Sequence, residues 1–209
     1  MMKIESVASR PDRAGRYAVC FENGKTMRLY RQTLEDFSLY SGAELTEEQY
    51  AKMCQHAGEI SAKMRAIRIV SASNVSKKDL QQRLIQKGES AKDAQNAVQW
   101  MTDMDLVDDR KTAQQIVTRC ISKGYGVSRA KQALYEKRIP KEYWEEVLED
   151  YPDQTDVIYT YLESKLSDNS DQKEIKRAID ALIRRGHSYG QIRRALDRLS
   201  LETETFTED

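Results

Sequence analysis

The 209-residue sequence is poor in the features that mark secreted, metal-binding or membrane proteins. Its three cysteines, Cys20, Cys54 and Cys120, are odd in number and widely separated, with no CxxC spacing. We therefore expect neither a disulfide framework nor a zinc site. No apolar run approaches the roughly 20 residues of a membrane span, and the first residues, MMKIESVASR, lack the apolar core of a signal peptide. These absences predict a cytoplasmic protein that does not enter a membrane.

An excess of charge of one sign is also missing, because 34 Lys and Arg balance 34 Asp and Glu to a formal net charge of +0. This balance argues against a protein that binds nucleic acid through bulk positive charge. With only 3 prolines and 9 glycines, and with abundant Leu, Ala, Gln, Glu, Lys and Arg, the composition favours helix. The chain is long enough for one large or two small domains with modest cores.

Recognisable catalytic and cofactor motifs are absent as well. His56 and His187 have no partner motif, and we expect His56 to lie on the surface or half-buried face of a long helix. KGYG at 123–126 lacks the spacing of a phosphate loop. Asp108 and Asp109 suggest a metal cluster at first sight, but acidic groups directly before a helix stabilise its positive end, which is the simpler interpretation. We expect no enzyme, no catalytic residue, no cofactor and no metal.

Residues 1–45 differ from the rest of the chain and predict a small β element. The stretch RYAVCFENGKTMRLY places β-branched and aromatic residues on both sides of Asn23 and Gly24. Asn-Gly is favoured in type I′ turns, in which both central residues have positive φ, so we expect a β-hairpin with such a turn. Thr46, with Gln49 three residues later, predicts the capped start of a helix.

Three octets that resemble one another divide the remainder of the chain. They are RLIQKGES at 83–90, ALYEKRIP at 133–140 and ALIRRGHS at 181–188. Each has a leucine at the same place, namely Leu84, Leu134 or Leu182, followed by a basic last turn that suits the negative end of a helix. Each octet therefore predicts a joint between two helices. The first helix is expected to end at Gly88, Arg138 or Gly186, and the second to start at Ser90, Pro140 or Ser188.

A further helix is expected before each joint, at 47–72, 109–123 and 154–166, because apolar residues recur there at helical spacing. The prediction is a mainly α protein of three tandem three-helix repeats with a small N-terminal β-hairpin element. A unit of this size buries only a small core, so the repeats should stack into an elongated array. The expected segments are an extension at 1–45, repeats at 46–106, 107–151 and 152–200, and an acidic tail at 201–209.

Charge is segregated along the sequence. Residues 110–138 have eight bases and one acid, residues 140–171 have two bases and ten acids, and residues 173–198 have eight bases and three acids. The basic stretches could contact phosphates or an acidic protein surface. The alternative, solvated faces that pair with one another, stays open. The candidate contact residues are Lys123, Arg129, Lys131, Lys137, Arg138, Lys176, Arg177, Arg184, Arg185, Arg193, Arg194 and Arg198.

Three stretches together resemble the RecX family of bacterial RecA regulators, over about residues 60–200. They are Ser76 to Gly88, with Leu80, Leu84 and Lys87 between them, LVDDRKTAQQIVTRCISKGYGVSRAKQALYEKRIP at 106–140, and LIRRGHSYGQIRRAL at 182–196. Two positions depart from the family pattern: Thr112 stands where we expect an aromatic residue, and Arg138 stands in place of a glycine.

The resemblance implies tandem three-helix repeats and a monomeric, non-enzymatic protein of recombination, DNA repair and the SOS response. Its partner would be the RecA filament on single-stranded DNA, whose growth, ATPase, strand exchange and coprotease activity it would restrain. Direct contact with single- or double-stranded DNA is a second expectation. Two alternatives remain open: a helix-turn-helix-like DNA-binding module, with a helix from 126 or 188 in a groove, and a helical scaffold for another protein.

Overall fold

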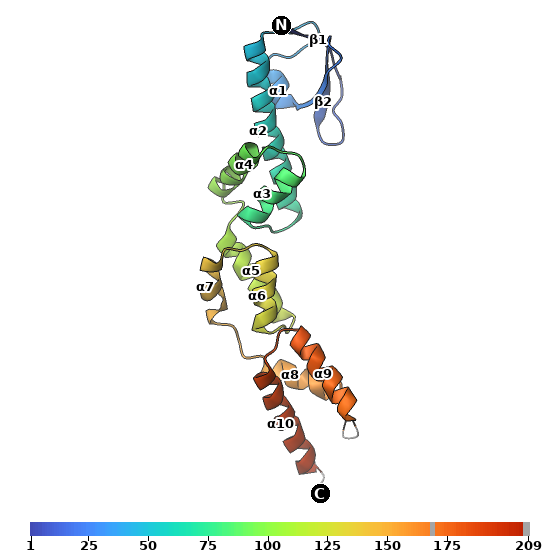
Figure 1. The fold of residues 1–209 in the computed structure, drawn as a ribbon, viewed down its shortest axis with the longest axis vertical. Helices are drawn as coiled ribbons and strands as arrows, with labels where there is room; N and C mark the ends of the chain where they lie inside the picture. The colour runs from blue at the N-terminus through green and yellow to red at the C-terminus, as the bar shows by residue number, and fades with distance from the viewer. Residues whose placement is uncertain (168–169, 207–209) are drawn as a thin grey trace. The chain divides into compact units, whose positions relative to one another are not determined.

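The computed structural model describes residues 1–167 and 170–206, of which residues 200–206 are described in their backbone alone. The chain divides into two compact units, Met1–Val107 and Asp108–Asp209. Figure 1 shows the order of the helices and strands along it.

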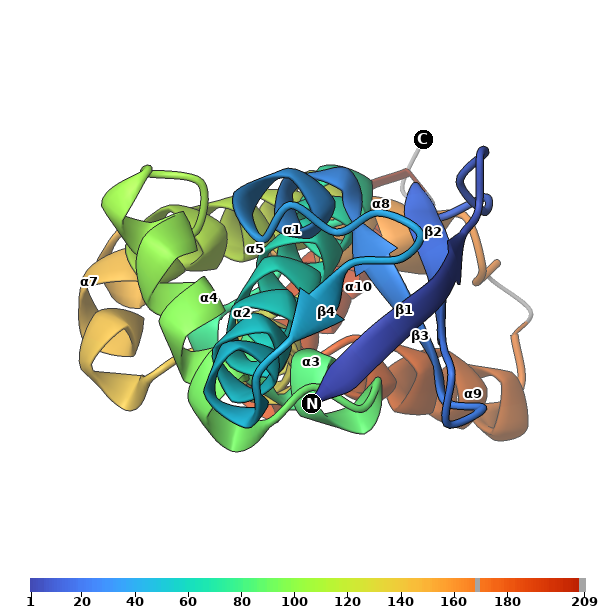
Figure 2. The same ribbon diagram turned by 90° about the horizontal axis from the view of Figure 1, so that it is seen from above.

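The first unit begins with a four-stranded antiparallel sheet in the order β3-β2-β1-β4. Its inward side chains, among them Ile4, Phe21 and Leu29, pack against Met53 of a long helix that lies alongside the sheet (Figure 2). The predicted hairpin is present as β2 and β3, and two further strands extend it. The bounds are β1 Met2–Val7, β2 Arg16–Phe21, β3 Thr26–Tyr30, α1 Arg31–Asp36 and β4 Glu44–Leu45.

The prediction of a type I′ turn between β2 and β3 is wrong. Gly24 has a φ of 79°, but Asn23 is not among the residues with positive φ. The Gly24 amide donates to the Phe21 carbonyl at 2.9 Å and the Phe21 amide to the Lys25 carbonyl at 2.8 Å. This is the pattern of a type I turn followed by a left-handed glycine. The Asn23 side chain accepts from the Lys25 amide at 3.1 Å, a local bond that replaces the left-handed conformation.

The first helical repeat follows the sheet directly. Thr46 caps its first helix as predicted, since its hydroxyl accepts from the Gln49 amide at 3.1 Å while the Gln49 side chain accepts from the Thr46 amide at 2.9 Å. Leu80 and Leu84 are fully buried in its core with Met101. The helices are α2 Glu47–Ala72, α3 Lys77–Gln86 and α4 Ala91–Asp103.

The second unit contains the other two repeats, each with its own core. Leu134 lies in the core of the second repeat and Leu182 in that of the third. The helix expected to start at Pro140 is a 3₁₀ turn, η1, followed by one short α-helix. The elements are α5 Asp109–Ser122, α6 Val127–Glu136, η1 Lys141–Tyr143, α7 Trp144–Glu149, α8 Thr155–Glu163, α9 Gln172–Arg184 and α10 Tyr189–Phe206.

The three joints have the same backbone geometry despite their different residues. The residue after the last helical turn is left-handed in each, with φ of 92° at Gly88, 55° at Arg138 and 87° at Gly186. Arg138 thus adopts the conformation that glycine adopts elsewhere, at a cost of about 1 kcal/mol for a residue with a Cβ. Ser90 caps α4, and the Ser188 hydroxyl accepts from the Gln191 amide at 3.3 Å.

These observations confirm a mainly α protein of tandem three-helix repeats with a small N-terminal sheet. The five expected segments stay a prediction. Helix α10 continues past residue 200 to Phe206, within the expected acidic tail, and residues 207–209 of that tail lie outside the described part.

Candidate interaction site

The joints of the second and third repeats meet backbone to backbone. The Gly126 amide donates to the Arg185 carbonyl at 2.9 Å, and the Ser128 amide donates to the Gly186 carbonyl at 3.3 Å. A Cβ on Gly126 would lie 2.1 Å from the Gly186 oxygen, and one on Gly186 would lie 2.3 Å from the Arg129 nitrogen. Glycine at both positions is therefore what allows the two repeats to approach so closely.

His187 completes this contact between the repeats. Its side chain is 4% exposed, and its Nε2 lies 3.1 Å from the Gly124 carbonyl oxygen. A carbonyl only accepts, so Nε2 carries the proton. Among the described residues none hydrogen-bonds the buried Nδ1. Burial, and to a lesser degree the charge of Arg185, lower the pKa of His187 below its ordinary value, against the opposite effect of the Gly124 carbonyl.

The lowered pKa of His187 predicts that the second unit loses stability on mild acidification. Below pH 6.5, the ordinary value for this group, the unfolded chain takes up a proton that the folded chain does not. Stability should fall as pH decreases from there, by at most about 1.4 kcal/mol per pH unit from one proton, until the folded pKa is passed. Urea unfolding between pH 7 and pH 5 measures the slope. His187→Gln, which can still donate to Gly124, should remove this contribution; an unchanged slope would contradict the assignment.

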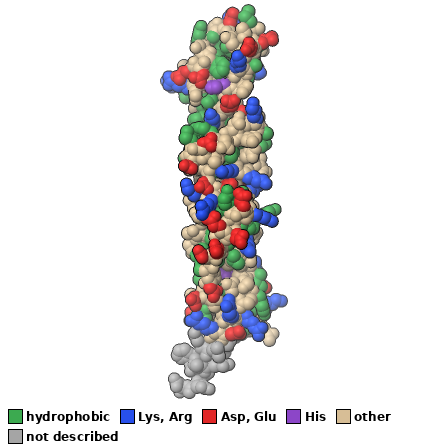
Figure 3. Space-filling model, turned by 90° about the vertical axis from the view of Figure 1, so that its left-hand side faces the viewer, with side chains coloured by type: hydrophobic (Ala, Val, Ile, Leu, Met, Phe, Trp, Pro, Cys, Tyr) green, Lys and Arg blue, Asp and Glu red, His purple; other side chains and the backbone are tan. Residues whose placement is uncertain are grey.

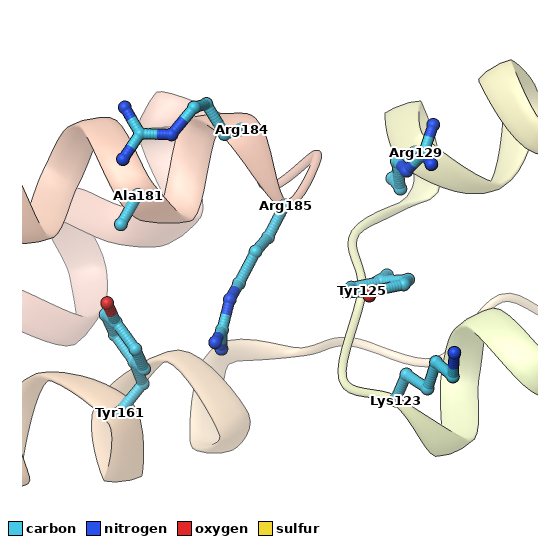
Figure 4. A pocket seen from close by; sticks show the side chains of 7 residues that line it. All are labelled: Lys123, Tyr125, Arg129, Tyr161, Ala181, Arg184 and Arg185. Carbon is cyan, nitrogen blue, oxygen red and sulfur yellow. The ribbon is translucent and has the colours of Figure 1, made fainter.

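A cavity of about 510 Å³ opens beside this contact. Four of the predicted contact residues line it, Lys123 and Arg129 from the second repeat and Arg184 and Arg185 from the third (Figure 4). The other lining residues are Tyr125, Tyr161 and Ala181. We call these seven residues the basic pocket. Its lining contains four cations and no acid, so it is suited to an anionic group.

The four cations differ in how far they are already engaged. The Arg185 guanidinium lies 4.5 Å from the centre of the Tyr161 ring, toward which it extends in Figure 4. Arg129 forms an ion pair with Glu136 at 3.1 Å. Lys123 and Arg184, both exposed, have no ion pair within the described residues. These two cations are the ones most available to an incoming anion.

The remaining predicted contact residues lie outside the basic pocket. Lys131 is exposed on α6, Lys176 and Arg177 are exposed on α9, and Arg193 is exposed on α10. The half-buried Lys137 and Arg138 belong to the joint after α6.

Two arginines of α10 are engaged elsewhere. Arg194 lines a second cavity of about 410 Å³, with Gln154 and Asp153. The pKa of Asp153 is lowered mainly by a hydrogen bond from the Thr155 side chain, and the charge of Arg194 adds a smaller effect in the same direction. Arg198 pairs with Asp156 at 2.9 Å and lies 4.4 Å over the Tyr159 ring.

The acidic block of the sequence supplies partners to both basic blocks. Arg110 pairs with Glu146 of α7, and Arg198 pairs with Asp156 of α8. On the face drawn in Figure 3, Lys and Arg side chains are interspersed with Asp and Glu. Part of the charge segregation therefore serves pairing within the second unit, and the basic pocket is where cations gather without acids.

The other polar candidates have structural roles. Asp108 caps α5, accepting from the amides of Arg110 at 2.8 Å and Lys111 at 3.1 Å, as the simpler interpretation predicted. His56 is half-buried, 3.2 Å from Asp36. Within residues 1–167 and 170–206 no group of three or more His, Cys, Asp or Glu side chains could hold a metal ion, and no helix has the length and apolarity to cross a membrane.

Sequence analysis missed the aromatic part of the pocket. Tyr125 lies between Gly124 and Gly126, and its carbonyl accepts from the Tyr151 hydroxyl at 2.6 Å. The flanking glycines were the available signal, because a chain that must turn and approach another backbone leaves the residue between them fixed in place.

Comparison with known proteins finds homologues of one kind, although no family model matches the chain. A protein named Regulatory protein RecX from Vibrio parahaemolyticus is 29% identical over 145 residues, 68% of this chain and 94% of its own length. One of the same name from Clostridioides difficile is 26% identical over 203 residues, 94% of each chain. A crystal structure of regulatory protein RecX, 19% identical, superposes with a TM-score of 0.64 over 94% of this chain and 100% of that one, which shows a shared fold.

The Vibrio relative matches 68% of the chain and the clostridial relative 94%, and their name agrees with the resemblance carried by the stretches at 76–88, 106–140 and 182–196. The chain is similar in sequence to proteins named Regulatory protein RecX and shares the fold of a RecX crystal structure.

Proposed function

We propose that this protein regulates RecA by binding its filament on single-stranded DNA, and that the usual effect is inhibition of recombinase, ATPase and coprotease activity. The similarity to proteins named Regulatory protein RecX supports a regulatory role. The observation that carries the contact is the basic pocket, with four cations and no acid at a junction held by backbone hydrogen bonds. A preorganised cluster of this kind binds an anionic surface without first having to assemble itself.

The chemistry of the pocket fits carboxylates of a protein groove or phosphates of the DNA inside the filament. Arginine presents paired N–H donors that match either anion, and lysine adds a mobile point charge. Arg184 and Lys123 come from different repeats, so an anion between them would also strengthen the contact between the repeats. Such a bridging contact would favour the folded arrangement of the second unit.

A titration of RecA's single-stranded-DNA-dependent ATPase with this protein tests the proposal. We expect the rate of ATP hydrolysis to fall when far less than one molecule of this protein is present per RecA subunit. Strand exchange should fall with it. The cognate RecA, from the same organism, is the enzyme to use. Unchanged ATPase, filament assembly and strand exchange at a twofold excess of the protein would overturn the proposal.

Action as a separate DNA-binding module has less support from the geometry. A recognition helix places its N-terminal residues against base edges. The N-terminus of α6 lies instead against the third repeat, where the Gly126 and Ser128 amides are bonded to Arg185 and Gly186. In this alternative, the recognition helix would be α10, at whose N-terminus Tyr189 is 64% exposed. Tight binding of duplex DNA without RecA, with a steep salt dependence, would favour the module.

A further inference from the structure

Each repeat exposes a large apolar side chain at the same place. The residue directly after the core leucine is Ile85, Tyr135 or Ile183, and these side chains are 44%, 71% and 49% exposed. The leucines before them, in the same order, are 0%, 0% and 1% exposed. We call Ile85, Tyr135 and Ile183 the apolar anchors.

Packing within the protein does not account for the apolar anchors. None of them belongs to one of the four hydrophobic clusters of the described residues. A single exposed apolar residue is ordinary on a protein surface. Here three exposed apolar side chains occupy equivalent positions in three repeats, although the residues around them differ. This recurrence indicates that each repeat uses its exposed apolar side chain for a contact of its own.

A basic residue follows each anchor within three positions. Lys87 follows Ile85, Lys137 follows Tyr135, and Arg184 with Arg185 follow Ile183. Glu136, which lies directly after Tyr135, is engaged by Arg129 at 3.1 Å. An apolar side chain beside a cation is complementary to an apolar pocket with an acidic rim.

We propose that the apolar anchors dock, one per repeat, into equivalent apolar, acid-rimmed pockets on a protein filament of identical subunits. Because this chain presents an exposed apolar side chain at the same position of each repeat, we expect a partner that presents the same pocket more than once. The partner is protein and not nucleic acid, because an isoleucine side chain neither stacks on bases nor donates to phosphates, whereas it fills a pocket well. This inference rests on the proposed function, in which the partner is the RecA filament.

The test replaces the anchors with serine, singly and together, and measures binding to RecA filaments on single-stranded DNA by co-sedimentation. Ile85→Ser, Tyr135→Ser and Ile183→Ser should each weaken binding about 5- to 10-fold, and the triple variant about 100-fold or more, because separate contacts add in free energy. The matched control replaces three other exposed apolar residues, Tyr40, Met104 and Leu106, which are 65%, 56% and 53% exposed. This control triple should bind within about twofold of the unmodified chain.

The outcomes separate this inference from the function on which it rests. If the unmodified chain does not bind filaments, the proposed function fails. If the unmodified chain binds and the anchor triple binds as tightly as the control triple, docking through the apolar anchors is overturned. The proposed function is retained in that case. Loss from one anchor alone, with the other two silent, overturns the one-per-repeat arrangement. Equal circular dichroism of the variants excludes unfolding as the cause, since the anchors lie outside the cores.

Discussion

Gly126→Ala is expected to destabilise the second unit by about 3 kcal/mol or more, because the added methyl group meets backbone atoms of the third repeat. The added Cβ would lie 2.1 Å from the Gly186 oxygen and 2.5 Å from the His187 nitrogen. Both are backbone atoms, so neither can move away as a flexible side chain would. Relief requires the joints of the two repeats to separate, which breaks the bonds from Gly126 to Arg185 and from His187 to Gly124.

Urea unfolding of the full chain measures this effect through Trp144 fluorescence. The chain has two tryptophans, so a Trp100→Phe background leaves Trp144, in the second unit, as the reporter. Gly190→Ala is the matched control within the second unit, since φ is positive at neither Gly126 nor Gly190 and nothing lies within 4 Å of a Cβ added at Gly190. As a glycine-to-alanine change inside α10, it should leave stability unchanged or raise it by up to about 1 kcal/mol. A Gly126→Ala midpoint equal to that of the unmodified protein would show that the two joints do not touch.

Local signals were sufficient for most of the helical architecture. The capping pair of Thr46 and Gln49, the acid that caps α5 and the basic ends of α3 and α9 each act within a few residues. Where a second chain segment decides the outcome, the sequence was less informative. Strand β1 pairs with β2 and β4, and no local periodicity gives the partners of a strand. The Asn23 turn differs from the prediction because a local side-chain bond competes with positive φ.

The basic pocket shows the same division between local and distant determinants. The clustering of bases in the sequence indicated all four of its cations before the structure was known. It did not indicate that Lys123 and Arg184, 61 positions apart, line one cavity, because this depends on the approach of Gly126 to Gly186. Nor did it indicate that Arg198 is paired with Asp156. Charge counts therefore predicted the candidate residues, and the joint between the repeats determines which of them line one cavity.

Reversing the two unpaired cations of the pocket, Lys123→Glu with Arg184→Glu, is expected to weaken inhibition of the RecA ATPase about 10- to 100-fold in apparent affinity. Each cation that faces an anion in the complex contributes on the order of 1 kcal/mol, and reversal replaces that attraction with repulsion. Both side chains are exposed, and neither has an ion pair within the described residues, so the fold should persist. The measurement is the inhibitor concentration at half-maximal ATPase rate, at two salt concentrations.

The matched control is Lys78→Glu with Lys92→Glu, which changes net charge equally at two exposed positions of the first unit. If net charge alone steers this protein to the filament, both double variants should lose affinity to the same extent and become equal at high salt. If the basic pocket contacts the filament, the pocket variant should lose far more than the control, and part of the loss should remain at high salt because a contact buried in the complex is poorly screened. Inhibition by the pocket variant equal to that by the unmodified protein would place the contact elsewhere on the repeats.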